Sequence, residues 1–405
     1  MKQKMSNRKF MAIVIPIMVF LLILVIAVTV ACNMFAPVLN NHLGRGEMHR
    51  EIPEGTEDWD TDYYDRRFET TEEAKEYTLS VNEEVVNEGM VLLKNNGVLP
   101  LSKSAAVTPF GRGYAHPIYN GNAAGGSIKY TDPEGEATVS PAEALGAKFT
   151  NIVTAAADLQ PESTGYKLGM WRPSETGSWY QPVEYTNYPD APAAAEGTTA
   201  HDVAQMGGDN YILELDASVY DSLSDTDLGK MKDSTALVFV TRSGNENADK
   251  KSDGYTDGTE HFLQLSKNER DMIAFAKESC KKVVLVVVAS NPIELDVVMD
   301  GELEADAIIW AGHPGDNGFK SLASILCGDV NPSGRLVDLF ATDFLDTPSF
   351  KNWGDFYYTN ATMWEFSETP PHAAGTKNED GKDLYYRPYV EYEEGMYNGY
   401  RYYET

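Results

Sequence analysis

The longest apolar run of the chain lies near its amino terminus, where 22 uncharged residues extend from Phe10 to Ala31, interrupted only by Pro16. Four basic residues precede it: Lys2, Lys4, Arg8 and Lys9. About 20 consecutive apolar residues span a bilayer, and a basic flank stays in the cytoplasm. The pattern predicts one amino-terminal transmembrane helix over 10–31, with residues 1–9 cytoplasmic. A single-pass cell-membrane protein with its bulk outside, and the lipid bilayer as a partner, would follow.

Two other interpretations of this run remain open. A cleaved signal peptide has an apolar core of about 7–15 residues, which is shorter than the observed run. A lipoprotein could be made at Cys32, although Thr29 to Ala31 form a weak cleavage box. Residues 32–68 are polar and acidic and are interpreted as a juxtamembrane spacer.

Helical periodicity begins after the spacer. Thr70 and Glu73 have the spacing of a capping box, and Gly89 could end the helix in a left-handed cap. The apolar residues between them share one face: Ala74, Tyr77, Val81 and Val85. The stretch 111–130, rich in Gly, Ala and Asn, predicts a long loop, and 160–210 show no clear period.

Three continuous apolar runs then predict strands that are covered on both faces. They are 236–240, 283–288 and 307–310. Ser266 and Glu269 form a second capping box, while Asp316 is expected to cap a helix that ends at Gly328. Alternating strands and helices predict an α/β class: a mostly parallel sheet sandwiched by helices over 69–346. Residues 347–405 form a Tyr-rich linker.

The composition narrows the possible ligands. The net charge is −29, and phosphate binding needs clustered Lys and Arg, so nucleic acid is excluded as a partner. A neutral ligand such as a sugar suits this surface better. The three cysteines have no regular spacing and no His-x-x-x-His pair occurs, so we expect no disulfide framework, metal site or cofactor.

Ligands of open parallel sheets bind outside the carboxyl ends of the strands. Arg242, Glu246 and Asp249 follow the first predicted strand, and a buried carboxyl there could act as a proton donor. Spacing alone favours the ordinary alternative, a solvated loop glutamate. Asn317, beside the helix-capping position 316, is a further candidate for substrate binding, while His313 is interpreted as a loop residue.

Several segments, taken in order, resemble the α/β-sandwich domain of glycoside hydrolase family 3 over roughly residues 70–405. They are VLLKNNGVLPL (91–101), RSGNENAD (242–249), NPIEL (291–295), WAGHPG (310–315), GDVNPSGRL (328–336), EG (394–395) and GYRYY (399–403). The last two resemble the link that leads on to a fibronectin-like module.

The resemblance implies a β-glucosidase-like or β-xylosidase-like hydrolase of O-glycosidic bonds in carbohydrate metabolism, with retention of configuration. Two carboxyl groups about 5–5.5 Å apart carry that chemistry, one as nucleophile and one as acid/base. By motif, Glu246 takes the acid/base role. Arg242 and Asp249 would support it and bind the β-linked glycoside, together with Asn317.

Two departures limit this resemblance. Asn245 and Asn247 flank Glu246 where the family has Gly, which alters the loop. The family nucleophile belongs to a (β/α)8 barrel of about 250 residues, which nothing here could form. Ser252 to Gly254 echo the nucleophile segment only superficially. We therefore expect the barrel in cis or in trans, and interpret the chain as a reversed-order member cut short before the barrel.

Two non-catalytic interpretations remain beside the enzyme. The chain could be a membrane-anchored module that binds sugars without hydrolysis. It could also be an interaction scaffold that docks a partner through the aromatic residues 390–405.

Overall fold

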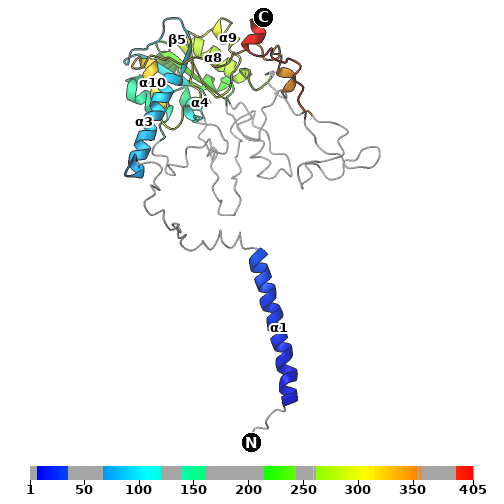
Figure 1. Ribbon diagram of the computed structural model, residues 1–405. Helices are drawn as coiled ribbons and strands as arrows, with labels where there is room; N and C mark the ends of the chain where they lie inside the picture. The colour runs from blue at the N-terminus through cyan, green and yellow to red at the C-terminus, as the bar shows by residue number, and fades with distance from the viewer. Residues whose placement is uncertain are drawn as a thin grey trace. The chain divides into compact units, whose positions relative to one another are not determined.

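The computed structural model divides the chain into two units, Met1–Glu69 and Thr70–Thr405 (Figure 1). The structure describes residues 7–34, 67–119, 138–160, 214–242, 259, 261–353, 356 and 389–404. The predicted spacer 32–68 and the linker 347–405 therefore lie largely outside the described residues, and their boundaries stay predictions.

The first unit contains helix α1 (Asn7–Met34). A membrane span needs about 20 apolar residues within one helix. Among the helices of the described ranges, none combines the length and the apolar character that this requires. The predicted transmembrane helix over 10–31 is corrected by that finding. The single-pass localisation and the bilayer as partner are corrected with it.

The second unit is built on a six-stranded sheet with the order β1-β6-β5-β4-β2-β3. The strands are β1 (Val91–Asn95), β2 (Ala106–Phe110), β3 (Asn151–Ile152), β4 (Thr235–Arg242), β5 (Lys282–Ala289) and β6 (Ala307–Trp310). β1 is antiparallel to β6, and the other neighbours are parallel. The sheet fits the predicted α/β class with a mostly parallel sheet. The sequence patterns had indicated β4, β5 and β6 as strands.

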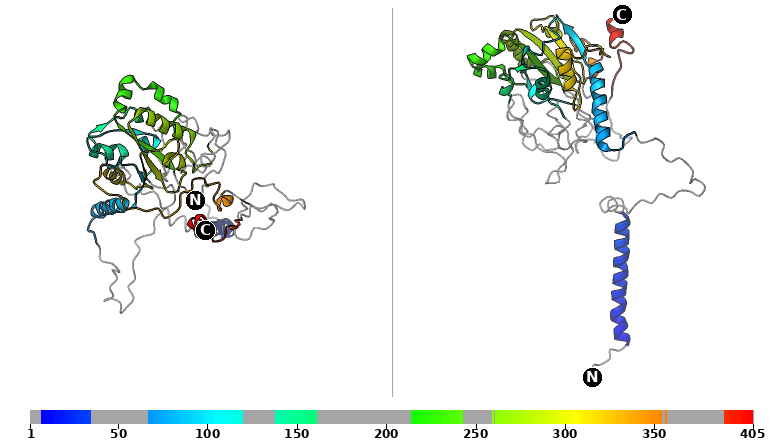
Figure 2. Two further views of the ribbon diagram at one scale, coloured as in Figure 1. Left: turned by 90° about the horizontal axis from the view of Figure 1, so that it is seen from above. Right: turned by 90° about the vertical axis from the view of Figure 1, so that its left-hand side faces the viewer.

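Helices cover both faces of this sheet (Figure 2). The helices that contribute to the two cores are α3 (Thr71–Gly89), α4 (Arg112–Ala115), α5 (Pro141–Lys148), α7 (Asp225–Met231), α8 (Lys267–Ser279), α9 (Asp296–Met299) and α10 (Phe319–Cys327). The short helix α11 (Tyr400–Tyr403) has no buried residue. Three 3-10 helices, η2 (Ala157–Leu159), η4 (Ala217–Ser222) and η5 (Phe350–Asn352), complete the described elements.

Successive residues of the central strands pack into two separate cores. Leu237 of β4 packs with side chains of α3, α5 and α10, whereas the adjacent Val238 packs with side chains of α7, α8 and η4. The strand period of two sends alternate side chains to opposite faces, and here both faces are dry. This two-sided burial explains why these strands are continuous apolar runs.

Two of the predicted helix caps are present in the structure and two differ from it. Ser266 and Glu269 form the complete capping box of α8, as predicted. Gly328 ends α10 in the left-handed region at φ 80°, also as predicted. Asp316 is not the cap of α10, because Gly318 holds that position without a side-chain bond. Gly89 is the last residue of α3, but its φ is not positive. The helix is instead capped by Met90 in an extended conformation.

Gly111 marks the point where the chain leaves β2 and turns into α4, a helix that the predicted loop over 111–130 did not include. Its φ is +92°, and an added Cβ would lie 2.5 Å from the backbone oxygen of Phe239. The turn therefore passes directly against the backbone of β4, where only glycine fits.

We predict that Gly111→Ala lowers the free energy of unfolding by at least about 2 kcal/mol, because it adds positive-φ strain to a backbone clash. Gly146→Ala is the matched control. Gly146 lies inside α5 with nothing within 4 Å of its added Cβ, so this change should raise stability by about 0.5–1 kcal/mol. Urea unfolding of both variants measures the difference. Equal effects would contradict the packing described for Gly111.

Candidate functional site

The candidate site lies at the carboxyl ends of β4, β5 and β6, where loops from neighbouring parallel strands meet. Glu246 and Asp249 belong to residues 243–258, which lie outside the described residues. The structure instead describes what precedes and follows them: the end of β4 and the segment 261–266, here called the return segment.

Arg242, the last residue of β4, is 1 % exposed and binds the return segment. Its Nη1 and Nη2 donate to the two carboxylate oxygens of Glu269, at 2.7 and 2.8 Å. Its remaining N–H groups donate to the backbone oxygens of Phe262 (2.7 Å), Thr241 (2.8 Å) and Gln264 (2.6 Å). All five donors of the guanidinium are thus used within the protein. Arg242 connects the end of β4 to the return segment, and its predicted contact with substrate stays a prediction.

Glu269 serves two structures at once. Its backbone N–H donates to the Ser266 hydroxyl at 3.2 Å, and its Oε2 accepts from the Ser266 N–H at 2.9 Å. The same carboxylate forms the bidentate ion pair with Arg242. The cap can be predicted from the sequence because Ser266 and Glu269 are three residues apart. The ion pair cannot be predicted in this way, because Arg242 and Glu269 are 27 residues apart.

The loop after β6 reaches the same place. His313 Nε2 donates to the backbone oxygen of Arg242 at 3.1 Å, although β5 lies between β6 and β4. His313 is therefore part of this rim. The interpretation of His313 as a plain loop residue omitted this contact.

Asn317 lies 2 % exposed and is turned toward α3. Its Nδ2 donates to the backbone oxygen of Leu79 at 2.9 Å, and its Oδ1 accepts from Asn82 Nδ2 at 2.5 Å. These bonds fasten the beginning of α10 to α3. The predicted role of Asn317 in substrate binding stays a prediction, and its hydrogen bonds describe a structural tie.

Glu214 is a buried carboxyl that the sequence patterns did not reveal, since the residues around it show no period. It accepts from the Arg112 N–H (2.8 Å), from Gln160 Nε2 (2.8 Å) and from the Leu215 N–H (3.0 Å). Burial, with a smaller contribution from the Glu269 carboxylate, outweighs these hydrogen bonds and raises the pKa of Glu214 to about 7. Glu214 is therefore close to half protonated at neutral pH.

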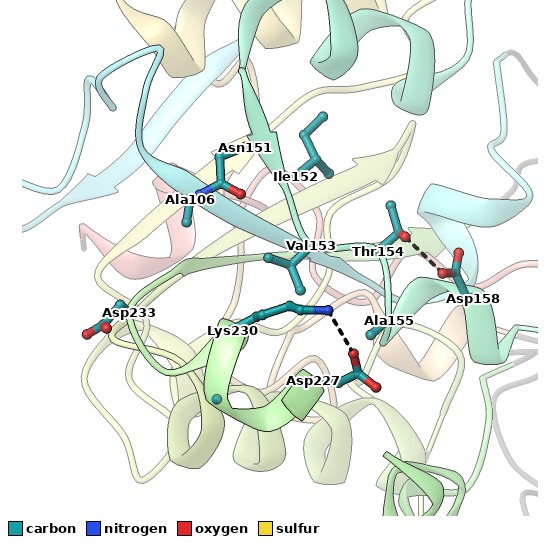
Figure 3. A pocket seen from close by; sticks show the side chains of 11 residues that line it. Ala106, Asn151, Ile152, Val153, Thr154, Ala155, Asp158, Asp227, Lys230 and Asp233 are labelled. Carbon is teal, nitrogen blue, oxygen red and sulfur yellow. Dashed lines mark hydrogen bonds and ion pairs between the residues drawn. The ribbon is translucent and has the colours of Figure 1, made fainter. Parts of the chain in front are cut away.

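A separate polar groove of about 520 Å³ lies beside the edge strand β3 (Figure 3). It is lined by Ala106, Asn151, Ile152, Val153, Thr154, Ala155, Asp158, Asp227, Gly229, Lys230 and Asp233. Lys230 pairs with Asp227 at 3.4 Å, and the Thr154 hydroxyl donates to Asp158 at 2.8 Å. β2 separates this edge from β4, so the groove is distinct from the rim that carries Arg242.

Within the part of the chain that the structure describes, no group of three or more His, Cys, Asp and Glu side chains is arranged to hold a metal ion.

We predict that Arg242→Met lowers the free energy of unfolding by about 3–5 kcal/mol, because it leaves the Glu269 carboxylate buried and unpaired. Lys230→Met is the control, since it removes an exposed ion pair worth under about 1 kcal/mol. Chemical denaturation followed by circular dichroism measures both. Equal losses of unfolding free energy in the two variants would show that the buried ion pair contributes no more to stability than the exposed one.

We predict that Glu214 makes the chain less stable as the pH rises. A carboxyl whose folded pKa is raised releases its proton more easily in the unfolded chain, so stability falls between about pH 4.5 and pH 7. Glu214→Gln removes this dependence. Its unfolding free energy relative to the unchanged protein should rise by up to roughly 3 kcal/mol from pH 5 to pH 8. Urea unfolding at both pH values measures this, and parallel pH curves would contradict it.

Comparisons with known proteins agree on one family. The model of the Glycosyl hydrolase family 3 C-terminal domain matches residues 90–400. A β-glucosidase of Ruminococcus albus is 27 % identical over 67 % of this chain and 24 % of its own length. β-Glucosidase A of Butyrivibrio fibrisolvens is 25 % identical over 80 % of this chain and 32 % of its own. The chain thus spans a quarter to a third of these relatives.

Among solved structures, β-glucosidase 3B from Thermotoga neapolitana in complex with glycerol aligns with 82 % of this chain and 36 % of its own, at 23 % identity and a TM-score of 0.48. The family match covers most of the chain and includes both the sheet and the rim around Arg242. The chain belongs to glycosyl hydrolase family 3 and carries its C-terminal domain.

Proposed function

We propose that this chain supplies the acid/base half of a retaining β-glycosidase, with Glu246 as the proton donor. The observation that carries the proposal is the clamp at Arg242. Its buried guanidinium joins the end of β4, which precedes residues 243–258 in the sequence, to the return segment, which follows them. A proton donor works when its loop is held by a rigid frame.

The proposed reaction has two steps. A carboxylate nucleophile attacks the anomeric carbon while Glu246 gives its proton to the leaving oxygen, and a glycosyl-enzyme forms. Glu246, now ionised, then takes a proton from water, whose oxygen attacks the same carbon and releases the sugar and the nucleophile. Asp249 binds the substrate beside Glu246. Arg242 and Asn317 support the site by holding its loops.

The nucleophile is proposed to come from a (β/α)8 barrel, in cis or in trans. The substrate class, β-glucosides or β-xylosides, is supported by the names of the similar proteins, which include β-glucosidases and a probable β-D-xylosidase of Arabidopsis thaliana that is 36 % identical over 18 % of this chain and 9 % of its own. The acidic composition is compatible with a neutral sugar.

A second candidate function is a non-catalytic module that binds sugars or a partner. The observation in its favour is an exposed aromatic surface near residue 400. Its members are Tyr392, Tyr397, Tyr400, Tyr402 and Tyr403. Exposed aromatic groups of this kind often mark interaction sites. A chain of this type would bind without turnover, and Glu246 would have no part in binding.

We predict that the full chain, combined with a barrel of the same family, hydrolyses a chromogenic β-glucoside, and that Glu246→Gln lowers kcat at least about 100-fold. The amide cannot donate the proton that the leaving group needs. Glu302→Gln is the control, because Glu302 is an exposed carboxylate outside the rim. Initial rates with and without the barrel measure this. Hydrolysis that is unaffected by Glu246→Gln would remove Glu246 from the mechanism.

A further inference from the structure

A second buried carboxylate, Glu294, lies beyond the end of β5 and is 4 % exposed. Its Oε1 is 3.1 Å from His261 Nε2 and accepts from the Phe344 N–H at 2.7 Å. Its Oε2 accepts from Gln264 Nε2 at 3.3 Å. Two of these partners belong to the return segment, and the third begins residues 344–353, here called the support segment.

The backbone repeats the same connection. The N–H of Glu294 donates to the carbonyl oxygen of Leu263 at 2.8 Å. The return segment is therefore fastened to the loop between β5 and α9 by a backbone bond and by two side-chain bonds. Arg242 at the end of β4 and Glu294 in the loop that follows β5 thus each bind this segment with one charged side chain.

Aromatic rings of the support segment surround His261, which is fully buried. The ring centroids of Phe344, Phe350 and Trp353 lie 6.2, 6.4 and 5.4 Å from the imidazole. The second imidazole nitrogen, Nδ1, has no hydrogen-bond partner in the described part of the chain. The Glu294 contact is thus the polar interaction that sets the orientation of this ring.

The electrostatics favour an ionised Glu294. Burial acts to raise its pKa, but the hydrogen bonds from His261, Phe344 and Gln264 outweigh burial and hold the pKa below its ordinary value. Removing the carboxylate would take this acceptor away from the buried His261 and from the part-buried Phe344 N–H. An unsatisfied buried donor costs about 1–3 kcal/mol.

We infer that Glu294 is a positioning residue that couples the support segment to the return segment, and thereby holds the proposed proton donor in place. The inference rests on the proposed function for its consequence in catalysis, but not for the coupling itself. The support segment then has a role that its distance in sequence from the acid/base motif did not indicate.

Hydrogen exchange of the full chain tests the coupling. Glu294→Ala should speed exchange about tenfold in both the return and the support segments, because the loss of acceptors lowers the cost of local opening. Glu294→Gln keeps an acceptor oxygen for His261 and Phe344 and should restore most of the protection. Asp296→Asn, an exposed carboxylate two residues away, is the matched control and should change neither segment.

A reciprocal variant separates coupling from simple packing. Trp353→Leu removes a ring from His261 and should speed exchange in the return segment, although Trp353 lies outside it. Faster exchange confined to the support segment would overturn the inference. So would a uniform increase over the whole sheet in Glu294→Ala, since that is a loss of global stability.

Kinetics of the chain with its barrel give the second readout. Glu294→Ala should lower kcat about tenfold with little change in KM, and Glu294→Gln should recover most of the loss. Coupled exchange without any Glu246-dependent hydrolysis would contradict the proposed function and leave Glu294 as a coupling residue. Glu246-dependent hydrolysis with unchanged exchange in Glu294→Ala would contradict the inference alone.

Discussion

A guanidinium and a carboxylate lie out of contact with water where the central strand β4 ends. Moving such charges from water into a protein is costly, and the cost is offset only when every donor and lone pair is well placed. Arg242 meets this condition, since its five N–H groups reach Glu269 and three backbone oxygens. The end of β4, the return segment and the start of α8 are tied through this one side chain.

Glu294 repeats this arrangement with the charge reversed. Arg242 donates from the last residue of β4 and Glu294 accepts from the loop between β5 and α9, and both bind the return segment. Side chains from rigid strands position a site more accurately than loops can by themselves. In the mechanism proposed for this member of glycosyl hydrolase family 3, such rigidity matters because the acid/base residue must deliver a proton to one oxygen at a fixed position.

The local sequence signals predicted the centre of the fold well and its periphery poorly. The apolar runs of β4, β5 and β6 were legible because both faces of these strands are dry. β2 is not a continuous apolar run, because Thr108 and Pro109 lie within it, and β3 consists of only two residues. The membrane span expected over 10–31 was wrong. It was predicted from the length of an apolar run alone, and no helix of the described residues is both long and apolar enough to cross a membrane.

By itself, the sequence determined the α/β class, the capping box at Ser266 and the family motifs, because these depend on residues within a few positions of one another. Tertiary structure alone decided the partners of the charged groups. Arg242 meets Glu269 across 27 residues, Gln160 meets Glu214 across 54, and Glu294 meets Phe344 across 50. Such pairs leave no periodic trace in a single chain, because their contact arises only when strands and loops that are distant in sequence pack side by side.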